Sequence, residues 1–133
     1  MRLYPLGPGE ILDRLTILSL KILHGEEAGK PTTHWEAEQD HLRASVTLYD
    51  VRPVAWDLIA LAAVNGALWE AEDELRARRR AGKFETDEAA VDACLLAIAN
   101  LAMKIQSLND RRAALVHEIN CLLGAEAPKE KLT

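Results

Sequence analysis

The sequence of 133 residues contains two cysteines and no long apolar run. Cys94 and Cys121 have no metal-ligand spacing, so we expect reduced, buried thiols in a cytosolic protein. The longest apolar runs, 58–64 and 93–99, are far shorter than the roughly 20 residues that span a bilayer. The N-terminal segment MRLYPLGPGE has no apolar stretch typical of a signal peptide. The sequence therefore predicts a cytoplasmic, soluble protein without a membrane partner.

Net positive charge and the common catalytic signatures are also absent. The chain has 16 lysines and arginines against 21 acidic residues, a net charge of −5, which gives no support for a nucleic-acid partner. It has no phosphate-binding glycine loop and no nucleophile elbow. The four histidines are scattered without ligand spacing. The sequence thus identifies neither a reaction nor a cofactor, and nucleophilic catalysis has no candidate residue.

What the sequence does have is helical periodicity. Between residues 97 and 124, apolar side chains recur every three or four positions, as on one stripe of a long amphipathic helix. Similar stripes predict helices over about 8–24, 34–46, 53–81 and 86–123. We therefore predict an all-α helical bundle built on a long antiparallel hairpin of the third and fourth helices, with two shorter N-terminal helices. Residues 1–124 form its single domain, and 125–133 form a polar C-terminal tail.

Prolines, glycines and capping residues mark the expected ends of these helices. Pro53 suits the first turn of the third helix. Thr33 with Glu36 has the form of a capping box for the second helix, and Thr86 is the expected N-cap of the fourth. Gly25 and Gly29 are expected to end the first helix, and 29–33 to form a loop.

Five polar residues fall inside the predicted apolar stripes: Asn65 and Glu72 on the third helix, and Asn109, Arg112 and Asn120 on the fourth. A buried amide or charged group costs several kcal/mol unless it is hydrogen-bonded. We therefore expect these side chains to be mostly buried and to bond across facing helices, with Arg112 pairing with Glu72. Two interpretations stay open: a structural network that fixes the register of the helices, or a polar pocket in the bundle.

The third helix also carries two charged clusters. The acidic cluster, residues 70–74, includes Glu70 and Asp73 and has the oxygen ligands that Mg²⁺ or Mn²⁺ prefers, although exposed helix faces are often rich in glutamate. The basic cluster, residues 76–83, either complements the helix dipole or binds phosphate. Neither cluster alone defines a site.

The predicted helix lengths favour a homodimer. At about 1.5 Å per residue, the third and fourth helices span roughly 43 and 55 Å. The two N-terminal helices are shorter and leave apolar surface uncovered at one end of the hairpin. We expect a second subunit to cover it, in a symmetric homodimer.

The most specific sequence signal lies in four stretches: Gly9–Lys21, Val64–Arg76, Ser107–Asn120 and the C-terminal LLGAEAPKEKLT. Together they resemble a small bacterial all-helical family of unknown function, with the motifs G-E-x-x-D-[KR]-x-T-I-L, L-W-x-x-E-D and N-D-x-R-A. A second uncharacterised helical family is similar over the third and fourth helices. The resemblance implies these candidate binding residues: Glu10, Asp13, Lys21, Asn65, Trp69, Glu72, Asp73, Asn109, Asp110, Arg112 and Asn120.

The resemblance implies no established activity, but it implies a link to bacterial cell-surface polysaccharide genes. The chain departs from the family at Ser19, where an acidic residue is usual, and at 86–96, which is longer than in the family. In an unbroken hairpin this insertion would place Trp69 level with Ala99 and not with Asn109. The two motifs would then meet within one subunit only if the insertion bulged or kinked.

Two functions of different classes follow. The first is a non-enzymatic, dimeric interaction or ligand-binding module, whose protein or small-molecule partner the sequence does not identify. A pocket would require Glu10, Asp13 and Lys21 to turn inward, with the aliphatic side of their helix against the second helix. The alternative is a Mg²⁺-dependent enzyme similar to the all-α nucleotide pyrophosphohydrolases, whose paired acidic motifs only Glu70 and Asp73 approximate.

Overall fold

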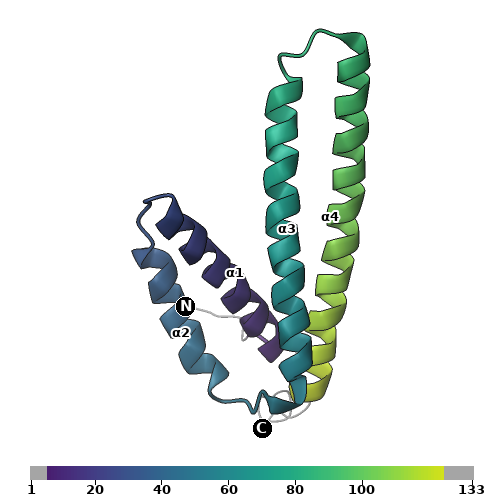
Figure 1. The fold of residues 1–133 in the computed structure, drawn as a ribbon. Helices are drawn as coiled ribbons and strands as arrows, with labels where there is room; N and C mark the ends of the chain where they lie inside the picture. The colour runs from purple at the N-terminus through teal and green to yellow at the C-terminus, as the bar shows by residue number, and fades with distance from the viewer. Residues whose placement is uncertain (1–5, 125–133) are drawn as a thin grey trace.

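The computed structural model describes residues 6–124, which form four α-helices and one short 3-10 turn (Figure 1). α1 (Pro8–Glu27) and α2 (Thr33–Val46) run antiparallel, and η1 (Arg52–Val54) leads into α3 (Ala55–Gly82). α4 (Glu88–Leu123) then returns along α3 without interruption. The predicted all-α bundle with a long hairpin and two shorter helices is confirmed. The predicted tail, 125–133, lies outside the described residues.

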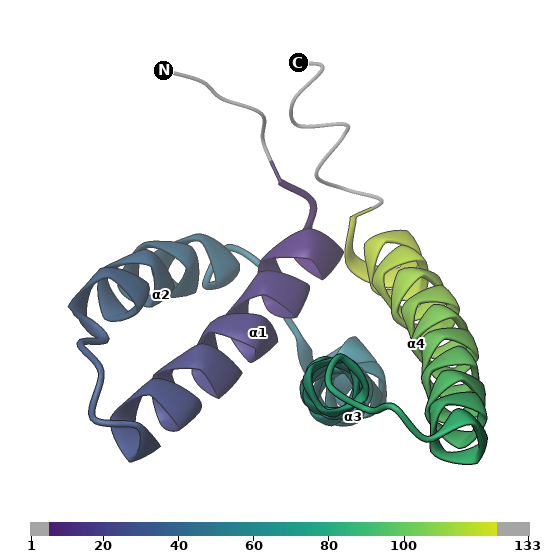
Figure 2. The ribbon, with the colours of Figure 1, turned by 90° about the horizontal axis from the view of Figure 1, so that it is seen from above.

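α1 positions the site because it packs on both α3 and α4, near the lower half of the hairpin (Figures 1 and 2). Where α1 meets the other helices, the apolar side chains of the predicted stripes are buried. One cluster joins α1 to α3 and α4 at the base, a second joins α1 to α2, and a third joins α3 to α4 above the base. Their buried members are, in order, Leu12, Val54, Leu61 and Ile119; Ile11, Leu18 and Leu42; and Val64, Leu68 and Leu108.

Two of the predicted caps are wrong by one position. α2 begins at Thr33, so Thr32 is the N-cap, and the Thr32 hydroxyl donates to Glu36 at 2.6 Å. α4 begins at Glu88, and the side chain of Asp87 caps it by accepting from the backbone N–H of Ala90 at 3.0 Å. In both cases two neighbouring residues are suitable caps, and sequence alone does not separate them.

Gly25 does not end α1, which continues to Glu27. The glycine is buried because α2 approaches it closely: a Cβ atom there would lie 2.8 Å from the ring of Trp35. The reversal comes instead at Gly29, whose φ of 69° is in the left-handed region that favours glycine. Pro53 lies in η1, just before α3 begins.

The prediction of buried cysteines is wrong. Cys121 is exposed on α4, and Cys94 is only partly buried, with its thiol 3.4 Å from the backbone carbonyl oxygen of Arg78. The helix α4 packs on one side only over most of its length, so a cysteine on another side meets solvent.

The upper half of the hairpin, away from α1, is a pair of helices without further cover (Figure 1). No side chain between residues 72 and 100 is buried. Leu95, Leu96 and Met103 are exposed on α4, and Phe84 is exposed in the connecting turn. The predicted uncovered apolar end is therefore present, while the homodimer inferred from it stays a prediction.

One helix of the described chain, Arg52–Gly82, is long and apolar enough to cross a membrane by length and composition alone. The core helix of a soluble protein meets the same criterion, and 33% of the most apolar window is buried here. This is weak evidence of a span, and the predicted cytoplasmic location stays a prediction.

Candidate functional site

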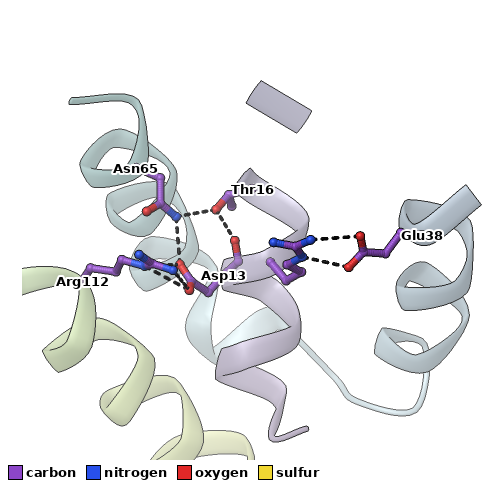
Figure 3. Close-up of polar contacts among 6 residues, drawn as sticks. Asp13, Thr16, Glu38, Asn65 and Arg112 are labelled. Atoms are coloured by element: carbon purple, nitrogen blue, oxygen red, sulfur yellow. Dashed lines mark hydrogen bonds and ion pairs between the residues drawn. The ribbon is translucent and has the colours of Figure 1, made fainter. Parts of the chain in front are cut away.

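A polar junction joins α1, α3 and α4, and we define it by Asp13, Thr16, Asn65 and Arg112 (Figure 3). Arg112 on α4 donates to Asp13 through Nε at 3.0 Å and through Nη2 at 2.6 Å. Asn65 on α3 donates through Nδ2 to Asp13 Oδ1 at 2.9 Å and to Thr16 Oγ1 at 2.6 Å. The Thr16 hydroxyl donates in turn to the backbone carbonyl of Asp13 at 2.8 Å. One carboxylate on α1 thus ties the other two helices together.

Burial makes this junction energetically important. Asn65 is 3% exposed, and the Asp13 side chain is 13% exposed. Leaving either group unpaired would cost the free energy of its lost hydration, on the order of 1–3 kcal/mol or more for the charge. The bidentate arginine–carboxylate geometry also fixes the orientation of both side chains. Of the expected polar layer, Asn65 is buried and Arg112 is partly buried, and the acid that joins them is Asp13 of α1.

A second polar contact holds the first turn of α1 on α4. The Asn120 amide donates to Glu10 Oε1 at 3.0 Å, and its Oδ1 accepts the Gly9 backbone N–H at 2.8 Å. That N–H is one of the groups at a helix N-terminus that lack a partner within the helix. A Cβ atom at Gly9 would collide with the Val116 carbonyl, so the glycine permits this close approach. Asn120 therefore has the facing-helix partner that the sequence requires.

An ion pair between Arg14 and Glu38 braces α1 against α2 (Figure 3). Arg14 Nε donates to Glu38 Oε2 at 2.8 Å, and Nη2 donates to Oε1 at 3.0 Å. The hydrogen bond from Arg14 holds the pKa of Glu38 below its usual value of 4.5, and it raises the pKa of Arg14. Helical periodicity does not indicate this pair, because no apolar stripe contains either residue.

Above the junction lies a hollow of about 320 Å³, which we call the upper hollow. Lys21, Arg76 and Arg112 bring three cations to it from three helices, and Glu72 brings one carboxylate. The rest of the lining is mostly apolar or aromatic: Ile17, Leu20, Asn65, Leu68 and Trp69. Its volume lies within the usual range for small-molecule pockets.

The Trp69 ring also stacks on His24 of α1, with centroids 4.5 Å apart and planes 7° apart. The stack joins α1 to α3 beside the upper hollow. His24 was not among the predicted site residues. Its position three residues after Lys21 indicates that both lie on the same face of α1.

Below the junction lies the lower hollow, of about 400 Å³, between α1 and α4. It is more polar, and the junction residues Asp13 and Arg112 are part of its lining. Its remaining lining residues are Glu10, Asn109, Ala113, Val116, His117 and Asn120. Amide, carboxylate and imidazole groups of this kind can bond to the hydroxyl groups of a ligand.

Most of the sequence-predicted site residues border one hollow or the other. The upper hollow has Lys21, Asn65, Trp69 and Glu72; the lower hollow has Glu10, Asp13, Asn109 and Asn120; and both include Arg112. Asp73 and Asp110 are exposed and line neither hollow. Of the three residues that the pocket interpretation turns inward, Asp13 is largely buried, Lys21 is partly buried and Glu10 is exposed. Their role in binding stays a prediction.

Two details of the prediction are wrong. Glu72 and Asn109 are exposed, and Arg112 pairs with Asp13 and not with Glu72. Arg112 lies level with Asn65, and Glu72 is two turns, or roughly 10 Å, farther along α3. The docking of α1 between α3 and α4 supplies the nearer acid.

The hairpin register brings the two family motifs to nearly the same level but to different hollows. α4 is unbroken, and Leu68 packs in one cluster with Ile105 and Leu108, so neighbouring Trp69 is level with about Leu108, next to Asn109, and the expected level at Ala99 is wrong. Trp69 lines the upper hollow and Asn109 lines the lower one. Arg112 connects the two motifs because its side chain reaches both hollows.

The acidic cluster of α3 points in several directions and does not converge. Asp73 pairs with Arg76, and Glu74 pairs with Arg78, all on the exposed side of the helix. Across residues 6–124, no three His, Cys, Asp or Glu side chains lie close enough together to hold a metal ion. The geometry therefore does not favour the metal-dependent alternative.

Comparisons of the chain with models of protein families, with curated proteins and with solved structures find no match. The family resemblance accordingly stays an interpretation of the sequence motifs, and we interpret the site from its own geometry.

Proposed function

We propose that this protein is a non-enzymatic module that binds a small anionic ligand in the upper hollow. The observation that carries the proposal is the convergence of Lys21, Arg76 and Arg112 from three helices on one hollow with an apolar floor. The lining has three cations and one carboxylate, although the whole chain has a net charge of −5. Arg112 and Arg76 are already paired with aspartates, so Lys21 is the cation that would attract an anionic ligand to that place.

The three cations differ in how they are already engaged. Arg112 is bound to Asp13, and Arg76 is paired with Asp73 at the exposed rim. Lys21 has no ion pair within 4.0 Å among the described residues. We therefore expect Lys21 to make the main new charge-assisted contact, with Arg76 as the second donor.

The residues that line the upper hollow indicate which chemical group of the ligand is attached to the anion. Trp69, whose ring stacks on His24, lines the hollow together with the apolar side chains of Leu20 and Leu68. Ring stacking with an aromatic side chain is a common mode of binding nucleobases. A phosphate or carboxylate attached to a flat ring fits this combination.

The lower hollow would bind the hydroxyl groups of the same ligand. Its amides and carboxylates suit a polyhydroxyl group, and Arg112 borders both hollows. The resemblance to a family linked to cell-surface polysaccharides makes sugar nucleotides the first ligands to test. Because the junction holds Arg112 in place without a ligand, little side-chain ordering would oppose binding.

The test is calorimetric titration with uridine diphosphate, a uridine-diphosphate sugar and inorganic phosphate. Lys21→Met removes one charge and keeps much of the aliphatic stem, and we expect it to weaken binding by about tenfold or more. Lys104→Met, an exposed position on α4, is the matched control and should bind like wild type. Wild-type protein that binds none of these compounds, or binds them equally well in Lys21→Met, would contradict the proposal. Mn²⁺ binding that requires Asp73 would favour the enzyme alternative instead.

A further inference from the structure

α3 has a second apolar face, on the side away from α4. Seen along the hairpin in Figure 2, α1 and α4 lie on two sides of α3, and no described helix covers the remaining side. Trp56 and Ile59 on this face are 83% and 59% exposed. Ala63 is exposed and Gly66 is partly exposed one and two turns farther along. A large exposed tryptophan beside an isoleucine is the kind of patch that marks an interface.

The residues of this face follow the spacing of a coiled-coil seam. Steps of four and three residues alternate along it, which is the heptad period of 3.5 residues per turn. The seam consists of Arg52, Trp56, Ile59, Ala63, Gly66 and Glu70.

The seam is complementary to itself when reversed. In an antiparallel pair centred at Leu61, Trp56 of one copy meets Gly66 of the other, and Ile59 meets Ala63. Each large side chain then faces a small one. We propose that two copies of this chain associate through the seam, as an antiparallel pair of α3 helices about a two-fold axis level with Leu61.

Gly66 supports a close approach of the second copy. A glycine inside a helix is less favourable than alanine by about 1 kcal/mol. A Cβ atom at Gly66 would meet no heavy atom within 4 Å, so no packing within the described chain requires the missing side chain. In the antiparallel pair, the bare backbone at Gly66 receives the indole of Trp56 from the second copy.

Charge complementarity at the ends of the seam favours the antiparallel orientation. In this register Arg52 of one copy faces Glu70 of the other. Glu70 is exposed without an ion pair among the described residues. The Arg52 side chain is 88% exposed and pairs with Asp50 at 2.7 Å, so in the dimer Arg52 would be shared between Asp50 and Glu70 of the other copy. A parallel pair in register would instead place arginine against arginine and the two Trp56 side chains against each other. Such rim charges select the orientation more than they add affinity.

The exposed apolar patch on α4 is a weaker candidate for the same contact. Leu95 and Met103 are symmetric about Ala99, so a two-fold axis there would also pair them. That arrangement places Glu88 opposite Asp110 of the other copy, and like charges at an interface oppose association. The α3 seam has no such pair.

The size of the seam sets the expected affinity. From Arg52 to Glu70 it is about 27 Å long at 1.5 Å per residue. One helix pair of this length buries less than the roughly 800 Å² per partner of a standard interface, so we expect a weak dimer and choose micromolar concentrations to detect it. The seam and the upper hollow are on different sides of α3, so each copy keeps its ligand site open.

Sedimentation equilibrium on the full chain tests the seam. Wild type should reach about twice 14.7 kDa at tens of micromolar. Gly66→Leu should raise the dissociation constant by more than about tenfold, because it fills the space for Trp56 of the second copy. Since the side chain enters open space in the single chain and leucine favours helix over glycine, the thermal midpoint measured at submicromolar concentration should not fall.

Charge reversal fixes the register. Arg52→Glu and Glu70→Arg should each weaken the dimer, and the double variant should restore it. Met103→Glu is the control for the α4 patch and should remain dimeric. A wild-type monomer at 100 μM, a dimer that persists in Gly66→Leu, or a dimer lost in Met103→Glu would overturn the proposal. Flotation with phospholipid vesicles in place of self-association would overturn it as well.

Discussion

The two halves of the α3–α4 hairpin differ in what covers them. In the lower half, α1 and η1 pack on the helix pair around Leu61, and Val64 and Leu68 are buried between α3 and α4. In the upper half, the two helices contact one another, and no side chain between residues 72 and 100 is buried. Burial of apolar surface is the main source of stability. The junction and both hollows therefore lie on or next to the stable half, and the upper half extends from it.

Matched leucine substitutions should give the largest difference between the halves. Leu61 has no exposed surface, so Leu61→Ala should lower the free energy of unfolding by about 3–5 kcal/mol through lost transfer energy and the remaining cavity. Leu96 is 64% exposed, and Leu96→Ala should change it by less than about 0.5 kcal/mol. Urea denaturation followed by circular dichroism at submicromolar protein measures both. Equal losses would mean that the upper half is covered in solution under those conditions.

Removal of the central acid should have the next largest effect. Asp13→Ala leaves the buried Asn65 amide and the Arg112 guanidinium without their shared acceptor. We expect a loss of about 2–4 kcal/mol in the free energy of unfolding, less than for a fully buried ion pair because Arg112 is partly exposed. Asp110→Ala, an exposed aspartate on α4, is the control and should be near neutral. An Asp13→Ala variant as stable as the control would show that the junction contributes no net stability.

Amide hydrogen exchange should locate the boundary between the halves directly. Amides of α3 beyond Arg76 and of α4 before Ala97 should exchange through local opening, at free energies at least about 1–2 kcal/mol below global unfolding. Amides near Leu61 and Ile119 should exchange only with global unfolding, because buried clusters surround them. Uniform protection along the whole hairpin would contradict this division.

The helices and their order could be predicted from the sequence because each carries a long apolar stripe with clear stops. The same stripes identified Asn65 and Asn120 as polar residues that need partners, and both have them. One-residue errors at Thr33 and Thr86 reflect neighbouring side chains that cap equally well. These features depend on local spacing, which a sequence contains in full.

The partners of the polar residues could not be predicted in the same way. Whether Arg112 reaches Glu72 depends on the register of α4 on α3, and whether it reaches Asp13 depends on where α1 docks along the hairpin. The stack of His24 on Trp69 depends on the same docking. Gly25 was misread for a related reason, because close packing against Trp35 and a helix stop both select glycine.

The smallest expected effect concerns the brace between α1 and α2, which lies outside the hairpin. Glu38→Gln removes the charge of the Arg14–Glu38 pair but keeps the shape of the side chain. Both side chains are more than a third exposed, so solvent screens the pair, and we expect a loss below about 1 kcal/mol at pH 7. Glu118→Gln, an exposed position on α4, is the matched control and should match wild type.

The dependence on pH separates this ion pair from a change in packing. Arg14 lowers the pKa of folded Glu38 below 4.5, so the unfolded chain takes up a proton at a higher pH than the folded chain does. The pair therefore stabilises the fold fully above pH 4.5, and its contribution is lost as the pH falls through the folded pKa. Urea denaturation from pH 7 down to about pH 3 should show wild type and Glu38→Gln converging in stability. A difference that stays constant over that range would come from packing and not from the charge of Glu38.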